Sequence, residues 1–236
     1  MDIRTIKSEL RGLANKKNAE GAQRFFKTGP GEYGEGDKFL GIRVPVLRKL
    51  AKEYQMITVE EAGHLLKSPI HEERLLSLFI LIHIYSKGEE AVKKGIYKFY
   101  LNNTRFINNW DLVDASAEHI VGNFLINKEK KPIYRLAKFE DLWERRISII
   151  STFCFIKHGQ YSETMKIAEM LLHDNEDLIH KAVGWMLREV GKRDQPLEEE
   201  FLKKYYKEMP RTMLRYAIEK FSELKRQHYL KGTIIF

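Results

Sequence analysis

Apolar residues recur at helical spacing along most of the chain. Between residues 42 and 54 they form one stripe, and the basic side chains of this stretch lie largely off it. Residues 70–84 are apolar nearly all round, which predicts a helix buried at the centre of the fold. Further helices are expected over residues 89–101, 109–126, 130–138, 141–158, 161–173, 175–191, 195–208 and 210–226.

Polar residues mark several helix ends. Thr58 and Glu61 have the spacing of a capping box and predict the start of a helix. In residues 195–208, three glutamates lie in the first turns and three lysines towards the end, which suits the helix macrodipole. Pro210 predicts the start of a further helix, because proline is favoured in a first turn.

These helices predict an all-α protein. Helix-forming residues dominate, and only six prolines and fifteen glycines occur in 236 residues. Short connections of two to five residues, with a helix pair every 35–40 residues, favour a solenoid of antiparallel helix pairs whose concave side binds a ligand. The repeats are degenerate, so a globular helical bundle is the alternative. No linker divides the sequence, and one domain over residues 1–236 is expected.

One glycine-rich stretch, residues 28–37, departs from the helical pattern. Its four glycines resemble a phosphate-binding loop. However, the order of a P-loop motif is missing, three acidic residues are present, and a helix is expected before it instead of a strand. We interpret this stretch as a flexible connector that does not bind a nucleotide.

The net charge of +8 and the isoelectric point near 9.3 suit a phosphate backbone or an anionic membrane as partner. The single cysteine, Cys154, lies in an apolar run and is expected to be buried and inert; it excludes an internal disulfide and a multi-cysteine metal site. The N-terminal residues lack a secretory pattern, and the longest apolar stretch, residues 75–85, is too short to span a bilayer. A cytoplasmic protein is expected.

Trp110 and Asp114 are the first candidate pair. They stand four residues apart in an expected helix and therefore share one face. A carboxylate attracts a cation directly, and an indole face attracts it by about 0.5–2 kcal/mol. The pair suits a positively charged, flat or sugar-like group, and an ion pair between Asp114 and a neighbouring arginine is the alternative. Asp111, behind a cap at Asn108 or Asn109, is interpreted as complementing the helix dipole.

Trp185 is the second candidate indole. Gly184 beside it is expected to leave that helix face open, and Arg188 follows one turn later; a tryptophan of the core is the alternative. Residues 144–146 precede the apolar run 147–156, so at least one of their arginines is expected at the margin of the core. Such an arginine could bind a phosphate through its planar guanidinium or form a surface salt bridge.

Metal and nucleophile chemistry is not indicated. The eight histidines include no HExxH motif and no closely spaced pair with a carboxylate, so no metal site is expected. The sequence also lacks a GxSxG motif and a plausible Cys–His dyad.

Four segments stand out in order along the chain: residues 39–45 (FLGIRVP), 109–114 (NWDLVD), 143–146 (WERR) and 181–189 (KAVGWMLRE). Together they resemble the AlkD-type alkylpurine DNA glycosylases, a family of HEAT-like helical-repeat proteins that excise cationic alkylated purines. The resemblance covers nearly the whole chain. It implies an all-α fold in which antiparallel helix pairs stack as a curved HEAT-like repeat solenoid.

By position, the resemblance implies roles for particular residues. Asp114 matches the catalytic carboxylate, and Trp110 and Trp185 match two indoles that contact the deoxyribose of the lesion. The implied DNA-binding residues are Arg146 at the backbone, Arg48 and Arg188 nearby, Arg43 and Lys181 within the matched segments, and Phe25 where a family tyrosine can sit.

The resemblance implies a DNA repair glycosylase that hydrolyses the N-glycosidic bond of N3- or N7-alkylated purines in double-stranded DNA. Asp114 would stabilise the oxocarbenium-like transition state or activate water. A monomer is expected, without a cofactor, a membrane or an obligate protein partner. The family also contains members that bind DNA without excising bases. The alternative is therefore a non-catalytic helical-repeat protein that binds DNA structure or a protein partner.

Overall fold

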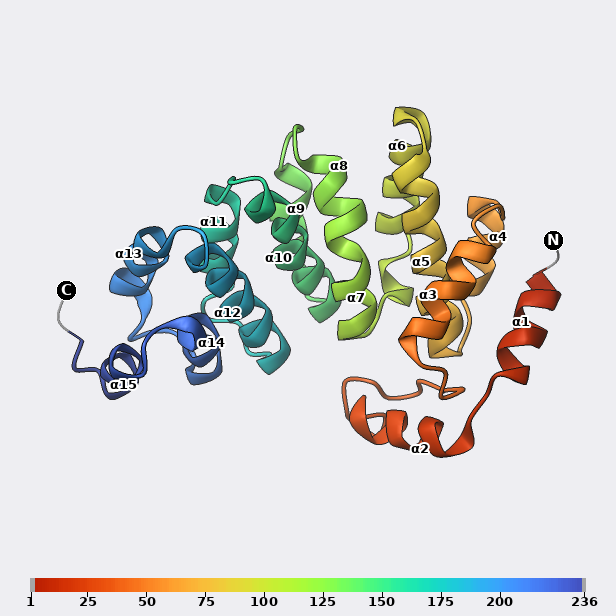
Figure 1. Cartoon of the computed structure of the whole chain (residues 1–236). Coiled ribbons are helices and arrows are strands. Elements are labelled where there is room, and N and C mark those ends of the chain that lie inside the picture. The colour runs from red at the N-terminus through yellow and green to blue at the C-terminus, as the bar shows by residue number, and fades with distance from the viewer. Residues whose placement is uncertain (1–2, 235–236) are drawn as a thin grey trace. The chain divides into compact units, whose positions relative to one another are not determined.

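Helices supply nearly all the regular structure in the computed structural model, which describes residues 3–234 (Figure 1). Within this range, extended backbone pairs only at an isolated bridge between Lys38 and Ile70, which confirms the predicted all-α class. The chain divides into two compact units, with the boundary between Ser116 and Ala117. The single domain over residues 1–236 stays a prediction. No helix in the described range has both the length and the hydropathy to cross a bilayer.

The first unit is built around α5 (His71–Lys87), in which every residue from His71 to Leu81 is buried. Helices α3, α4 and α6 pack against α5 and lie beside it in Figure 1, which confirms the predicted central helix. The other elements of this unit are α1 (Ile3–Gly12), α2 (Lys16–Phe25), α3 (Val44–Glu53), α4 (Val59–Leu66), α6 (Glu90–Leu101), the 3-10 turn η1 (Thr104–Phe106) and α7 (Trp110–Ala117).

Local polar signals set two helix starts in this unit. The Glu61 N–H donates to Thr58 Oγ1 at 3.1 Å, and the Thr58 N–H donates to Glu61 Oε2 at 2.6 Å, so the predicted capping box is complete. At α7, the Trp110 N–H donates to Asn109 Oδ1 at 2.8 Å. Of the two asparagines expected to cap this helix, Asn109 makes the contact.

The second unit packs α12 (Asp177–Gly191) against α10 and α14. Gly184 allows the close approach of α14, because an added Cβ would lie 2.4 Å from the Met213 carbonyl oxygen. The predicted open face beside Trp185 is therefore wrong at Gly184, which is buried under α14. The remaining elements are the π-helical turn η2 (Glu118–Gly122), α8 (Asn123–Leu125), α9 (Lys131–Leu136), α10 (Leu142–Lys157), α11 (Ser162–Met170), α13 (Gln195–Tyr205), α14 (Arg211–Ala217), the 3-10 turn η3 (Ile218–Lys220) and α15 (Glu223–Lys231).

Two predicted helices differ from a regular α-helix. The helix expected over residues 109–126 is continuous from Trp110 to Leu125 but contains the π-helical turn η2, where Gly122 lies so close to α10 that an added Cβ would meet the Ser151 carbonyl oxygen at 2.2 Å. The helix expected over residues 210–226 ends in η3, and a new helix starts after Ser222, whose Oγ accepts the Lys225 N–H at 3.4 Å. The polar cap lies inside an apparently continuous helical pattern, so periodicity alone did not separate α14 from α15.

Candidate active site

Trp110 and Asp114 both lie on α7 and are both half-buried. Their separation of four residues places them on one face of the helix, as predicted. Tyr100 lies close enough to Asp114 for the two to interact electrostatically: burial raises the pKa of Tyr100, and the negative charge of Asp114 raises it further. The Tyr100 hydroxyl is paired with Ser116 Oγ at 2.9 Å. Asp114 is therefore a partly exposed residue beside the buried Tyr100.

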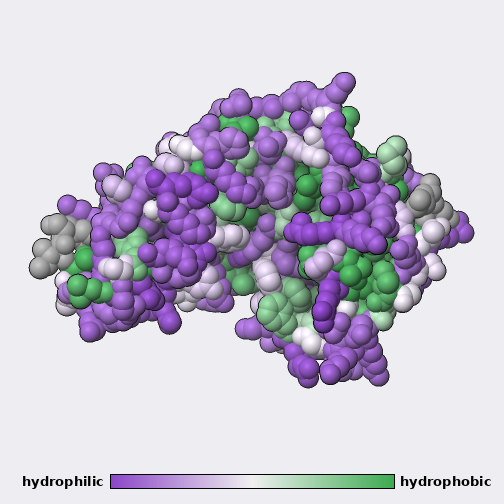
Figure 2. All heavy atoms as spheres, in the orientation of Figure 1, coloured by the Kyte–Doolittle hydropathy of each residue, from purple (hydrophilic) through white to green (hydrophobic). Residues whose placement is uncertain are grey.

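Two phenylalanines from α2 and its C-terminal end hold the indole of Trp110. Phe26 stacks on it at 5.3 Å between centroids with 23° between the planes. Phe25 meets it edge-on at 5.9 Å. Phe25 is 65% exposed, and Figure 2 shows hydrophobic atoms at the surface over the α2 region. The indole is thus braced on one side by an aromatic cluster, part of which faces solvent.

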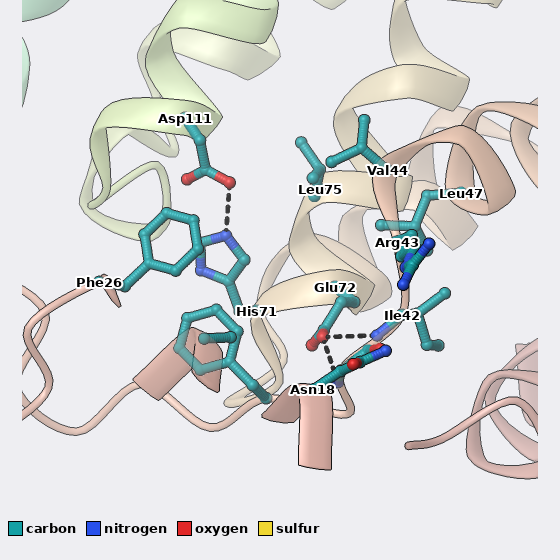
Figure 3. A pocket seen from close by; sticks show the side chains of 13 residues that line it. Asn18, Phe26, Ile42, Arg43, Val44, Leu47, His71, Glu72, Leu75 and Asp111 are labelled. Carbon is teal, nitrogen blue, oxygen red and sulfur yellow. Dashed lines mark hydrogen bonds and ion pairs between the residues drawn. The ribbon is translucent and has the colours of Figure 1, made fainter. Parts of the chain in front are cut away.

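A buried histidine lies next to Phe26 of this cluster, as Figure 3 shows. His71, the first residue of α5, is 2% exposed. Its Nε2 lies 2.8 Å from Asp111 Oδ2, and its Nδ1 lies 3.1 Å from Asp37 Oδ2. Burial by itself would lower the pKa of His71, but hydrogen bonds to Asp111 and Asp37 outweigh it and raise the pKa to about 8. The ring is therefore largely protonated at neutral pH and bridges two carboxylates.

Asp37 joins three elements around this histidine. Its Oδ1 accepts from Arg74 Nη2 at 2.6 Å, and its Oδ2 accepts from Asn109 Nδ2 at 3.2 Å. Burial by itself would raise the pKa of Asp37, but the His71 hydrogen bond and the Arg74 charge outweigh it and hold the pKa below the ordinary 3.8. The stretch 28–37, predicted as a flexible connector, is therefore anchored at its end by a buried ion pair.

Asp111 lies in the first turn of α7, as the dipole-complementing role predicted from the sequence requires. It also pairs with His71, forty positions away, which the sequence did not predict. Its other oxygen, Oδ1, is buried and has no hydrogen-bond partner within residues 3–234. The hydrogen bond from His71 to Oδ2 therefore offsets most of the free-energy cost of burying this carboxylate.

Glu72, next to His71, shapes the segment FLGIRVP. Its carboxylate accepts the backbone N–H groups of Leu40, Gly41 and Ile42 at 2.9, 2.7 and 3.2 Å. The loop turns at Gly41, where φ is +79°, a conformation that favours glycine. A cavity of about 200 Å³ opens beside this loop, between Phe26, Phe39, Arg43, His71 and Asp111 (Figure 3).

The two remaining predicted residues of the first unit are arginines. Arg43 is exposed and lines this cavity. Arg48 is exposed on α3, with its guanidinium 4.4 Å from the centroid of the Phe79 ring. Both are accessible to an anion, and their contact with DNA stays a prediction.

Trp185, in the second unit, is half-buried on α12. Its Nε1–H donates to Glu189 Oε1 at 3.3 Å, and its ring lies 5.8 Å from that of Phe153. Lys192 and Arg193 also donate to the Glu189 carboxylate, and the hydrogen bond from Lys192 contributes most to holding its pKa below the ordinary value against the effect of burial. The indole edge is thus fixed by an anion that is itself held by two cations.

The predicted basic residues of the second unit are engaged within the protein. Arg188, 16% exposed at its side chain, is ion-paired with Glu219, and Lys181 pairs with Asp177 at 2.7 Å. Arg146 is 5% exposed and donates from Nη1 to the Leu178 carbonyl oxygen. Burial of Arg146 weighs against a direct phosphate contact, which stays a prediction.

Of the predicted site residues, the first unit holds Trp110, Asp114, Phe25, Arg43 and Arg48, and the second unit holds Trp185, Arg146, Arg188 and Lys181. Sequence reasoning missed the buried cluster of Asp37, His71, Arg74, Asn109 and Asp111. One signal was available: residues 71–74 place four charged or titratable side chains at the start of a helix with an otherwise apolar pattern. Buried groups of this kind need partners from elsewhere in the chain.

The fold and the half-buried Trp110–Asp114 pair define a helical-repeat protein with a candidate site for a cationic group. The sequence model of a family described as "DNA alkylation repair enzyme" matches residues 6–221. The chain therefore belongs to the DNA alkylation repair enzyme family, which confirms the resemblance and gives the protein a role in DNA repair.

A solved structure described as a predicted DNA alkylation repair enzyme from Enterococcus faecalis is similar to this one, with a TM-score of 0.68. The two share 16% sequence identity, and the similarity covers 89% of this chain and 98% of that chain. At this level of identity the likeness shows the HEAT-like helical fold. No curated protein matches the sequence.

Proposed function

We propose that this protein is a DNA glycosylase that hydrolyses the N-glycosidic bond of N3- or N7-alkylated purines in double-stranded DNA. The observation that carries the proposal is the placement of Asp114 and Trp110 on one face of α7, both half-buried. A carboxylate and an indole in this arrangement suit a substrate that carries positive charge. Membership of a DNA alkylation repair family supports an alkylated base in DNA as the group that carries this positive charge.

The chemistry needs little beyond this pair. An alkylated purine is cationic, so it leaves with the electron pair of the glycosidic bond as a neutral base. Positive charge then develops on the deoxyribose, where the Asp114 carboxylate stabilises it electrostatically. A water molecule adds its oxygen to C1′ and gives its proton to Asp114 or to solvent. No metal ion or cofactor takes part in this sequence of steps.

Trp110 contributes through its ring face. Indole attracts a cation by about 0.5–2 kcal/mol. The positive charge on the deoxyribose develops only in the transition state, so this attraction lowers the barrier. Phe26, stacked on Trp110, reduces the freedom of the ring before the substrate arrives. Trp185 is proposed as a second indole for the deoxyribose, and the Glu189 carboxylate would hold its edge.

The Asp114→Asn variant tests the proposal. Removing the negative charge while keeping the shape should slow release of 7-methylguanine from a methylated duplex by about a hundredfold or more, with DNA affinity little changed. Glu60→Gln, an exposed carboxylate on α4, is the matched control and should keep the wild-type rate.

Two outcomes would contradict the proposal. An Asp114→Asn variant that releases base at the wild-type rate removes this carboxylate from the reaction. A wild-type protein that binds the duplex but releases no base favours the non-catalytic DNA-binding protein instead.

A further inference from the structure

The first turn of α7, which carries Trp110, is linked to α5 and to the connector through a buried histidine. Asp111 follows Trp110 directly in the first turn of α7, and its carboxylate is hydrogen-bonded to Nε2 of His71. The Nδ1 of the same ring is hydrogen-bonded to Asp37 at the end of the connector. We propose that His71 is a positioning residue: by bridging Asp37 and Asp111 it sets the first turn of α7, and so the orientation of Trp110 towards the substrate. The inference rests on the proposed function for what Trp110 contacts, and on geometry for the rest.

The contacts of Asp111 make this bridge a requirement for the turn. One carboxylate oxygen of Asp111 is buried without a partner in the described chain, and the other depends on His71. An unpaired buried carboxylate is strongly unfavourable. Without the donor from His71, Asp111 would turn towards water, and the first turn of α7 would move with it. Trp110 is the neighbouring residue in that turn.

A second route connects His71 to Trp110 through side chains. The His71 ring lies 4.6 Å from the Phe39 ring and 5.0 Å from the Phe26 ring, measured between centroids. Phe26 in turn stacks on Trp110. A shift of the imidazole would therefore reach the indole through one intervening ring. Backbone and aromatic routes lead to the same residue.

The protonation of His71 decides how many carboxylates it can hold. A protonated ring donates from both nitrogens, whereas a neutral ring donates from one. The charged groups around the ring come from three other parts of the unit and from its own helix. They are Asp37 from the connector, Asp111 from α7, Arg43 across the shared cavity, and Arg74 and Glu72 from α5. The residue after α2 and the loop before α3 contribute the uncharged rings of Phe26 and Phe39.

These surroundings favour the protonated ring at neutral pH, with a pKa of about 8. Above that pH one of the two carboxylates loses its donor. The orientation of Trp110 should then become less fixed.

The experiment follows Trp110 directly by 19F NMR, with the three tryptophans replaced by 5-fluorotryptophan. Trp110→Phe identifies the Trp110 signal. In the otherwise unmodified protein this signal should shift with a midpoint near pH 8, while the signal of Trp143, in the second unit, should not follow that midpoint. His71→Gln should abolish the shift, and His64→Gln, an exposed histidine on α4, should preserve it.

Enzyme kinetics give a second measurement. His71→Gln should lower kcat for base release by about tenfold or more with a smaller change in KM, because a misplaced group costs rate more than binding. The wild-type rate should fall as the pH rises through about 8, and this fall should be absent in His71→Gln.

A Trp110 signal that stays constant across this range in the unmodified protein overturns the positioning role, whatever the activity. The same holds for a signal that titrates equally in His71→Gln. A wild-type protein that shows the titration but releases no base contradicts the proposed function and leaves the positioning of Trp110 by His71 standing.

Discussion

The buried His71 makes the stability of the first unit depend on pH. Its pKa rises from the ordinary 6.5 to about 8 in the folded protein, so the folded state holds the proton more tightly than the unfolded chain does. The corresponding stabilisation is fully present below about pH 6.5 and is lost as the pH rises through about 8. Since each pKa unit is worth about 1.4 kcal/mol, this stabilisation amounts to about 2 kcal/mol.

Glu198, in the second unit, acts in the same direction. It is buried, and desolvation raises its pKa from 4.5 to about 9, so its burial also becomes more unfavourable as the pH rises. The comparison of wild type with His71→Gln removes this contribution, because Glu198 is present in both proteins.

The assay is urea denaturation followed by circular dichroism, at pH values from about 6 to about 9. The wild-type free energy of unfolding should fall by about 2 kcal/mol more than that of His71→Gln over this range. Parallel curves for the two proteins would refute the reasoning, because they would show that His71 has the same proton affinity in the folded and unfolded states.

Two further changes test the packing that holds the site. Arg74→Ala leaves the buried Asp37 carboxylate without its guanidinium and should lower the free energy of unfolding by about 3–5 kcal/mol in the same assay; a loss below about 1 kcal/mol would place this pair in solvent. Gly184→Ala puts a Cβ 2.4 Å from the Met213 carbonyl oxygen and should cost about 1–3 kcal/mol. Gly95→Ala on α6, where an added Cβ meets nothing within 4 Å, should be neutral or slightly stabilising.

Periodicity and local caps predicted much of the fold. The apolar run over residues 70–84 identified the central helix α5, and the spacing of Thr58 and Glu61 identified the start of α4. Each of these signals comes from residues that are close together in the sequence. The break before α15 was missed because Ser222 interrupts a helical pattern without changing its period.

In the candidate site, too, contacts within one helix could be predicted and contacts between distant segments could not. Trp110 and Asp114 could be paired from the sequence because four residues separate them on one helix. The partners of His71 lie 34 and 40 positions away, and no local pattern joins them. The place of Asp111 in the first turn of α7 could therefore be predicted, but its contact with His71 could not. Gly184 was misread for the same reason, since the atoms that need its small size belong to α14.

One measurement tests the central claim most directly: single-turnover release of 7-methylguanine from duplex DNA by the wild type and by Asp114→Asn, with enzyme in excess. We expect steady release by the wild type and a rate lower by about a hundredfold or more in the variant, at unchanged DNA affinity. Equal rates in the two proteins, or no release by either, would contradict a glycosylase that acts through Asp114.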